Sequence, residues 1–309
     1  MYYCRKMRVT FESFSEWKNY LERSTVPIWR PVLEYEMELR NRTEQQIWDG
    51  LAAAYAVMRD AVEKGLTQNM QSISGMIDNG AKKIKNSPIT VLSEEFKMLI
   101  YRSIAAKEVN ACMGKIVAAP TAGASGILPG ILTTLQDLYH LDNQKIYEAM
   151  LVAAGIALII ERRASIAGAV GGCQAETGTA AAMGAGAITY TFNGNIDQIL
   201  DSVAITIMNM LGLICDPIAG LVEVPCVKRN ASAAVIAFAS AQIALAGDSS
   251  IIPVDEVIDV MGEVGQAMDS RYKETALGGL AATPTGKKIA EKVLKNPSEI
   301  IHYNDENIS

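Results

Sequence analysis

The stretch TGTAAAMGAGAITYTFNGNI, residues 177–196, contains no charged side chain and consists mainly of small residues. Residues 230–247 form a second uncharged stretch, which is rich in Ala and Ser. A helix that is apolar on all sides belongs in the interior of a protein, where small side chains let backbones pack closely. We therefore interpret both stretches as buried helices around which the rest of the chain folds.

These stretches are poor candidates for membrane spans. Crossing a bilayer takes about 20 predominantly apolar residues, whereas residues 177–196 include four glycines and several threonines and asparagines. Residues 149–160 are more apolar, but Glu161, Arg162 and Arg163 follow them directly. The N-terminus, MYYCRKMR, has no apolar segment typical of a signal peptide. The sequence favours a cytoplasmic protein over a membrane protein.

Helix start signals recur along the chain. Thr43 and Gln46 have the form of a capping box, and Ser93 opens another helix in a weaker version. Asp142, Asn195 and Pro253 stand before three further segments with helical character. The expected helices are residues 47–64, 96–113, 146–160, 199–213 and 254–268. Alternating strand patterns are very few, so the sequence predicts an all-α fold.

The charge balance limits the kinds of partner. The 309 residues include 28 basic and 34 acidic side chains, which gives a net charge of -6 and a pI near 5.2. The basic residues come only in short pairs, such as Arg162-Arg163. These features argue against nucleic acid as a partner. The length is compatible with one large domain that buries a sizeable core.

Histidine is scarce and cysteine is not. The chain has two histidines and five cysteines. A Ser-His-Asp triad would have to use His140 or His302, and His140 is explained more simply as a residue at a helix end. An odd number of dispersed cysteines does not indicate a disulfide framework in a reducing compartment.

Four segments between the expected helices are rich in glycine, proline or small hydroxyl residues. Because glycine lets the backbone approach a ligand closely, they suggest a shared internal site. Neither a phosphate loop nor a dinucleotide fingerprint fits, since Ala281 and Lys288 break the first pattern and the third glycine of the second is missing. The segments are residues 119–130, 168–178, 215–230 and 278–287.

Three cysteines, Cys173, Cys215 and Cys226, fall in these segments, whereas Cys4 and Cys112 do not. Glycine and proline neighbours suit a thiolate that must be aimed at a metal. The spacing of 42 and 11 residues is a weak signal by itself. Buried structural cysteines remain the alternative at this point, because free cysteine is often simply buried.

Longer motifs carry a resemblance. Pro27-Ile28-Trp29, Ser72-Ile73-Ser74-Gly75 and Glu108-Val109-Asn110-Ala111 occur in that order, followed by the four glycine-rich segments. Together they resemble the α chain of the iron-sulfur-dependent L-serine dehydratases, also called L-serine ammonia-lyases. The resemblance covers most of the chain, and about the first 20 residues and those from about 290 lie outside it. It implies an N-terminal arm (1–45), a helical catalytic domain (46–290) and a C-terminal tail (291–309).

The resemblance also implies a cofactor and a reaction. Cys173, Cys215 and Cys226 match the three cysteines that hold a 4Fe-4S cluster in that family. Its fourth iron has no protein ligand and serves as the Lewis acid toward the hydroxyl of L-serine, while a base removes the α proton. The products are pyruvate and ammonia. A metal that activates the leaving group is consistent with a chain poor in histidine.

Further candidate site residues surround that centre. We expect contacts to the substrate or to the cluster ligands from small or polar residues of the glycine-rich segments, although turn and cap chemistry is an equal alternative for each. Fixed cations suit the carboxylate of an amino acid, although solvated charge is the simpler interpretation of each one. The polar candidates are Thr121, Ser125, Gly126, Asn230, Thr283 and Thr285. The cationic candidates are Lys228, Arg229 and Lys287. No residue is assigned as the base.

The chain departs from the family pattern at two places before Cys173. Ala167 stands where relatives commonly have a serine, and Arg162-Arg163 stand where asparagines are expected. These differences make the amino-acid preference less secure than cluster binding, so L-threonine or L-cysteine remains an alternative substrate. A helical scaffold subunit without a cluster is the alternative from another class. The Ser-Ser-His-Thr segment of single-chain relatives is absent, so a separate β subunit is implied, and an oligomer is expected.

Overall fold

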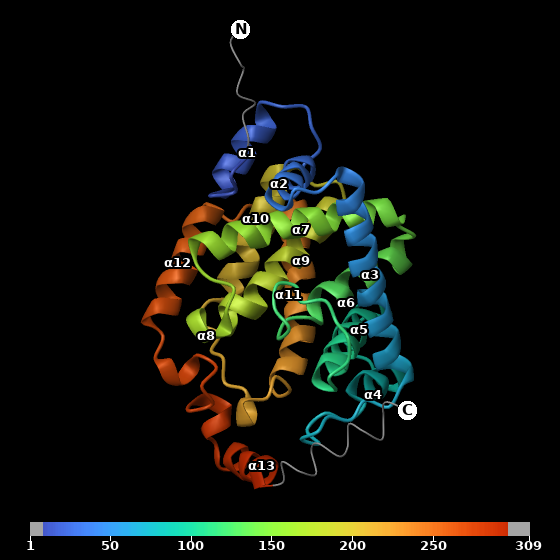
Figure 1. Cartoon of the computed structure of the whole chain (residues 1–309), viewed down its shortest axis with the longest axis vertical. Helices are drawn as coiled ribbons and strands as arrows, with labels where there is room; N and C mark the ends of the chain where they lie inside the picture. The colour runs from blue at the N-terminus through green and yellow to red at the C-terminus, as the bar shows by residue number, and fades with distance from the viewer. Residues whose placement is uncertain (1–8, 296–309) are drawn as a thin grey trace.

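The computed structural model describes residues 9–295 and contains no β-strand within that range. The chain is therefore all-α over its described part, as the sequence predicts. This range contains two isolated β-bridges, which pair Gln71 with Asp78 and Cys215 with Lys273. In Figure 1, α1 and α2 lie at one end of the long axis and α13 lies at the other.

The longer helices begin where the capping signals place them. Thr43 with Gln46, and Asn195 with Gln198, form complete capping boxes in which each side chain accepts from the backbone N–H of the other residue. Ser93 and Asp142 cap by accepting a backbone N–H. His140 ends a helix in the left-handed conformation. These helices are α3 (Glu44–Thr67), α5 (Glu94–Ala111), α6 (Ile127–Tyr139), α7 (Asn143–Arg163), α10 (Ile196–Met210) and α12 (Val254–Ala267).

Helix α9 (Thr179–Thr191) occupies the centre of the molecule. It packs against α6, α7, α10 and α11 (Cys226–Leu245), and nearly all of its residues are buried. A side-chain carbon at Gly184 would overlap Ile131, and one at Gly186 would overlap Ile156. The absence of side chains at these two glycines therefore lets isoleucines of α6 and α7 rest on the α9 backbone.

The N-terminal segment packs into the main core. Phe11, Phe14 and Trp17 are fully buried, and the last two belong to α1 (Phe14–Glu22). The carboxylate of Asp255 on α12 accepts hydrogen bonds from the backbone N–H groups of Phe14 and Ser15 at 2.9 and 3.0 Å. A carboxylate at a helix N-terminus satisfies groups that have no partner inside the helix. Helix α12 thus supplies the cap that α1 needs.

Helix α7 is long and apolar enough to meet a length and composition test for a membrane span. Among the described residues it is the one helix that could span a membrane by length and composition, and 56% of its most apolar 18 residues are buried inside the molecule. Its fully buried residues include Ile146, Val152 and Ile156 of the main core. Burial against α9 accounts for its apolar composition.

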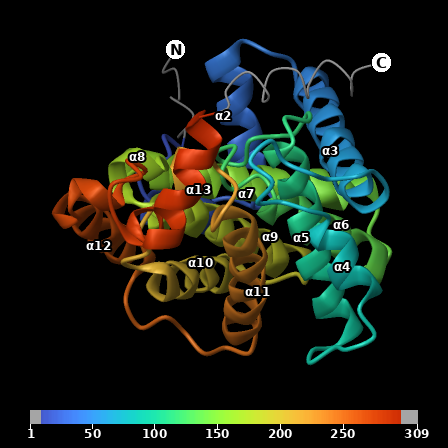
Figure 2. The same ribbon diagram turned by 90° about the horizontal axis from the view of Figure 1, so that it is seen from below.

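The remaining elements are short and surround these helices. Figure 2, seen from below, shows α13 facing the viewer, with α12 on one side of it and α4 and α5 on the other. They comprise α2 (Arg30–Arg40), α4 (Gly80–Asn86), α8 (Gly168–Gly171), a π-helix (Gln174–Gly178), 3-10 turns (Ile218–Gly220, Ser270–Tyr272, Gly279–Ala282) and α13 (Pro284–Lys295). Most of the expected C-terminal tail, residues 296–309, lies outside the described residues.

Candidate functional site

The structure buries the three candidate ligand cysteines. Cys173, Cys215 and Cys226 are 1%, 3% and 5% exposed, whereas Cys112 is only half-buried. Cys173 directly precedes the π-helix, and Cys226 is the first residue of α11. Cys215 lies in the segment between α10 and α11, where its N–H donates to Tyr272 and its C=O accepts from Glu274. Three separate segments therefore contribute one thiol each.

These thiols lie close enough to perturb one another. A hydrogen bond between the two thiols lowers the pKa of Cys173 and raises that of Cys215, and burial raises the pKa of Cys215 further. The Cys173 sulfur also lies 2.9 Å from the hydroxyl oxygen of Thr177. Burial raises the pKa of Cys226 to about 12, and the charge of Cys173 adds to this effect. The three side chains thus form one electrostatically linked group.

Two predicted site residues join the first glycine-rich segment to Cys226. The Asn230 side chain accepts from the N–H of Gly126 at 2.8 Å and donates to the carbonyls of Gly123 and Cys226 at 2.8 and 2.9 Å. Asn230 is fully buried, so each of its bonds is made without competition from water. This side chain fixes residues 123–126 against the start of α11.

A buried lysine, Lys107 of α5, lies behind the same segment. It is 0% exposed, and its ammonium donates to the carbonyl of Ala122 at 2.9 Å and to the side chain of Asn110. Burial lowers its pKa to about 8, against the opposing effect of the thiols and Glu176. Lys107 thus places a fixed positive charge beside the cysteines.

Glu176 is the central carboxylate of the site. It lies in the π-helix three residues after Cys173 and is 8% exposed. Its Oε1 atom accepts a hydrogen bond from the hydroxyl of Thr121, a predicted site residue. A π-helical turn inserts an extra residue and often occurs at functional sites. Here the turn brings Glu176 to the first glycine-rich segment.

Arg229 is engaged by a neighbouring carboxylate. Its Nη1 atom lies 2.9 Å from Oδ1 of Asp216 and donates to the carbonyl of Ile214. The other oxygen of Asp216 accepts from the N–H of Leu280 at 2.7 Å. Arg229 and Asp216 therefore hold the third and fourth glycine-rich segments together, and the charge of Arg229 is balanced by Asp216 in this structure.

The other predicted site residues make no side-chain hydrogen bond to the cysteine group within the described chain. Thr283 accepts from the N–H of Gly286 at the start of α13, which is ordinary cap chemistry. Thr285, Lys287 and Lys228 are exposed. Ser125 is fully buried, and its hydroxyl has no hydrogen-bond partner among the described residues.

All four glycine-rich segments, expected to lie between helices, are partly helical, since residues 127–130 begin α6 and residues 284–287 begin α13. Residues 168–178 form α8 and the π-helix, and Cys226 to Asn230 make up the first turn of α11. The expectation failed because glycine near a helix start indicates close packing as readily as a turn. Gly171, for example, lies at 3.0 Å from the position that a side-chain carbon of Gly265 on α12 would take. Cys226 consequently lies at a helix N-terminus, where backbone N–H groups are available to a thiolate.

The sequence of this chain matches a known protein family. The family model described as "Serine dehydratase alpha chain" matches residues 23–281. The chain belongs to this family. The "L-serine dehydratase, alpha chain" of Peptoniphilus asaccharolyticus is 45% identical over 273 residues, which cover 87% of this chain and 94% of the relative. The "Probable L-serine dehydratase, alpha chain" of Bacillus subtilis is 41% identical over 265 residues, 85% and 88% of the two chains.

Longer relatives also match this chain. The "L-serine dehydratase TdcG" of Escherichia coli K12 is 34% identical over 259 residues, which are 79% of this chain but only 56% of the relative. These similarities agree with the family resemblance of the motifs. One of those motifs has a direct structural partner near the site. The hydroxyls of Ser72 and Ser74 donate to Glu223, three residues before Cys226, at 2.6 and 2.5 Å.

The donor set of the three cysteines is chemically suited to an iron-sulfur cluster. No three His, Cys, Asp or Glu side chains within residues 9–295 are arranged around a single metal ion. A cubane cluster makes a different demand, because each thiolate binds a different corner iron. Three buried thiols on separate segments, two of them at helix starts, meet that demand and provide no fourth thiolate.

The departures from the family pattern serve packing. Arg162 donates to the carbonyl of Thr10, the carboxylate of Glu12 and the hydroxyl of Tyr35. Arg163 pairs with Asp259 on α12 through two hydrogen bonds of 3.1 and 2.6 Å. Both arginines therefore attach the N-terminal segment and α12 to α7, and their contacts lie on those elements rather than on the cysteines.

Sequence reasoning missed Glu176 and Lys107. Glu176 had one signal, its position three residues after Cys173 in a stretch otherwise free of charge. Lys107 stands next to the Glu108-Val109-Asn110-Ala111 motif, but nothing in the sequence shows that its ammonium is fully buried. A charged residue in a helix is usually solvated, so only the tertiary structure separates these two from the others.

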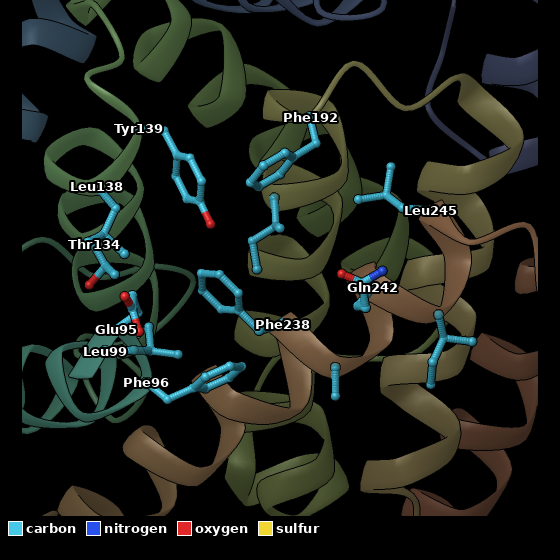
Figure 3. A pocket seen from close by; sticks show the side chains of 13 residues that line it. Glu95, Phe96, Leu99, Thr134, Leu138, Tyr139, Phe192, Phe238, Gln242 and Leu245 are labelled. Atoms are coloured by element: carbon cyan, nitrogen blue, oxygen red, sulfur yellow. The ribbon is translucent and has the colours of Figure 1, made fainter. Parts of the chain in front are cut away.

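An apolar pocket of about 520 Å³ lies elsewhere, between α5, α6, α9 and α11. Figure 3 shows the rings of Phe96, Tyr139, Phe192 and Phe238 lining it. Its lining shares no residue with the cysteine site. The pocket is therefore a separate feature of this family member.

Proposed function

We propose that this chain is the catalytic α subunit of an L-serine dehydratase, which converts L-serine to pyruvate and ammonia with a 4Fe-4S cluster held by Cys173, Cys215 and Cys226. The observation that carries the proposal is the convergence of these three buried thiols from separate segments. Membership of the family and relatives named L-serine dehydratase support the reaction. L-Serine is the substrate in this proposal.

The reaction balances without an external oxidant. L-Serine loses its α proton and its hydroxyl group as water to give 2-aminoacrylate. The imine tautomer then takes up water and releases ammonia, which leaves pyruvate. When bound, the cluster supplies a Lewis-acidic iron that assists departure of the hydroxyl group.

The chain's own residues arrange the site for this chemistry. Asn230 fixes the first glycine-rich segment against Cys226, so the loop backbone is held before a substrate arrives. Lys107 adds a buried positive charge beside a site that holds several acidic groups. Burial of these groups lowers the local dielectric and strengthens each electrostatic contact with a charged substrate.

A separate β subunit is part of the proposal. The relatives of comparable length are named alpha chains, which supports a further chain in the enzyme. The longer Escherichia coli relative contains additional sequence beyond the part that this chain matches. In our proposal the β subunit supplies substrate-binding groups to the site.

The cluster can be tested by iron and sulfide analysis after anaerobic purification. We expect iron and sulfide bound to the wild-type chain, with absorbance near 400 nm that is lost in air. Cys215→Ala is expected to lose most of the iron, because one of three thiolate ligands is removed. Cys112→Ala is the matched control, since its thiol lies outside the group. Iron retained in full by Cys215→Ala would contradict the ligand assignment.

The reaction can be tested with a pyruvate assay coupled to lactate dehydrogenase. We expect pyruvate from L-serine when the chain is combined with its β subunit. A panel of L-serine, L-threonine and L-cysteine should give at least tenfold lower turnover for the last two. A cluster-loaded αβ complex that prefers either of those amino acids would reassign the substrate and leave the cluster proposal intact.

A further inference from the structure

The two carboxylate oxygens of Glu176 have different surroundings. Oε1 accepts from the Thr121 hydroxyl and lies against Gly123, where any side chain would overlap it. Oε2 has no hydrogen-bond donor within residues 9–295, although the side chain is 8% exposed. One oxygen is therefore anchored to the first glycine-rich segment, and the other remains available to a ligand.

The free oxygen points toward the cysteine group. The position that a side-chain carbon of Gly168 would occupy lies 3.2 Å from the sulfur of Cys215 and 3.6 Å from Oε2 of Glu176. The same position lies 3.4 Å from a carboxylate oxygen of Glu274. Gly168 thus leaves room beside a ligand thiol, with carboxylate oxygens around it.

A buried carboxylate without a cation is unusual. No lysine or arginine of the described chain forms an ion pair with Glu176, and the Lys107 ammonium instead donates to Ala122 and Asn110. Burial of a charged group is costly unless a partner compensates for it. An anion held in this way, with one unoccupied oxygen beside the reaction centre, is complementary to a cationic group of the substrate.

We propose that Glu176 binds the α-ammonium group of the substrate amino acid through its Oε2 atom. This inference rests on the proposed function, because it assumes an amino acid whose hydroxyl is directed to the cysteine-bound cluster. The ammonium group carries three N–H donors, and a carboxylate oxygen is their natural acceptor. Thr121 is a positioning residue in this arrangement, since its hydroxyl fixes Oε1.

The test compares two ligands on the cluster-loaded αβ complex. L-Serine carries the α-ammonium group, whereas L-glycerate has a hydroxyl group in its place and retains the rest of the molecule. In Glu176→Gln we expect the KM for L-serine to rise at least 30-fold, because a charged partner is lost. The inhibition constant of L-glycerate should change less than threefold, and the iron content should stay at the wild-type level.

Matched variants show that the effect belongs to this carboxylate. Glu161→Gln on the surface of α7 should leave both constants unchanged, since this side chain is exposed. Thr121→Val retains the carboxylate but removes the bond to Oε1, and it should raise the KM for L-serine by a smaller factor, about threefold to tenfold. This second variant keeps the test decisive if Glu176→Gln does not fold.

The possible outcomes separate the inference from the function on which it rests. A wild-type complex that binds a cluster but forms no pyruvate would remove the proposed function. With an active wild type, equal weakening of both ligands in Glu176→Gln would overturn the inference. A second result would also overturn the inference. If Glu176→Gln bound L-serine as tightly as the wild type but no longer exchanged the α proton with solvent, Glu176 would be the base.

Discussion

Asp216 shows how a single buried side chain supports the site. It is 1% exposed, pairs with Arg229 at 2.9 Å and accepts from the N–H of Leu280. Asp216→Asn would remove the charge and leave the guanidinium without its partner, which should destabilise the fold by about 2 kcal/mol. Calorimetry should show a fall in melting temperature of roughly 4 °C.

The control for Asp216 is a surface pair of the same type. Asp60 and Lys64 form an i,i+4 ion pair of 2.9 Å on α3, and both side chains are more than 40% exposed. Exposed pairs contribute little because water screens them. Asp60→Asn should therefore leave the melting temperature within about 1 °C of the wild type. Equal effects of the two variants would show that burial of Asp216 is not what matters.

Lys107 gives the stability of the chain a specific pH dependence. Its pKa is about 8 in the folded state and near 10.5 when exposed, because burial disfavours the ammonium. Below pH 8 both states are protonated and the full cost of burial is present. Between pH 8 and 10.5 the unfolded state binds more protons, so this group makes stability rise with pH.

Lys107→Met removes that titration. The free energy of unfolding of the wild type, relative to the variant, should rise by roughly 2 to 3 kcal/mol between pH 8 and 10.5. Guanidinium unfolding followed by tryptophan fluorescence measures both proteins at each pH, and groups that do not interact with Lys107 cancel in the difference. A constant difference over this range would show that Lys107 does not titrate as assigned.

The type of a residue indicates a functional site from the sequence only where that residue type is uncommon. Cysteines in glycine-rich segments are few, so the sequence separates Cys173, Cys215 and Cys226 from Cys4 and Cys112, while their predicted role as ligands comes from the family resemblance. Glutamate and lysine are common on surfaces, and burial alone distinguishes Glu176 and Lys107. Burial depends on how distant helices pack, which a local pattern does not contain.

The contact between α3 and α5 depends on one glycine. A side-chain carbon at Gly65 would lie 2.6 Å from the Cα atom of Ala105, so the two backbones touch. Gly65→Ala should destabilise the fold by about 3 kcal/mol, because α3 or α5 must move. Gly50 lies on the same helix with nothing within 4 Å, and Gly50→Ala should stabilise by about 0.5 to 1 kcal/mol. Denaturant unfolding of both variants tests this contrast, and equal signs would contradict it.

The attachment of α1 depends on Asp255 of α12. Asp255→Ala removes the acceptor for the N–H groups of Phe14 and Ser15, so α1 should open more often. Limited trypsin digestion, followed by mass spectrometry, should show cleavage at Lys18 or Arg23 about tenfold faster, which corresponds to about 1.4 kcal/mol. Asp259→Ala, one turn further along α12, is the control and should leave this rate near that of the wild type.

Capping residues predicted helix starts well, and short elements were predicted poorly. A cap such as Thr43 or Asn195 acts through its own neighbours within one turn, so its signal is local. Helix α8 and the π-helix have no side-chain cap, and the residues of the π-helix are all buried. Packing against α12 and α9 holds these turns, and the sequence around Gly168 and Glu176 does not encode that packing.

The all-α class of the whole molecule was predictable because most of the chain reads as helix. The position of the N-terminal segment was not, since Phe11, Phe14 and Trp17 reach the main core through residues more than 100 positions away. The same holds for the thiols, which come together only after α9, α10 and α11 have packed. Long-range contacts of this kind follow from topology rather than from local pattern.

Cluster binding should accordingly stabilise the folded molecule as a whole. A ligand that binds the native state and not the unfolded chain raises the melting temperature. The anaerobically loaded chain should therefore melt at a temperature several degrees above that of the same chain after iron removal. Cys215→Ala should show little difference between the two preparations. A loaded wild type that melts with the iron-free protein would indicate that the thiols do not share a bound group.

The two glycines of α9 also constrain how sequences of this fold can diverge. Ile131 and Ile156 lie on the backbone at Gly184 and Gly186. A larger residue at either glycine is acceptable only when the isoleucine facing it becomes smaller in the same lineage. A substitution at either glycine should therefore occur together with a smaller residue at the facing isoleucine. Whether a given substitution at the glycine is tolerated should depend on which residue occupies the facing position.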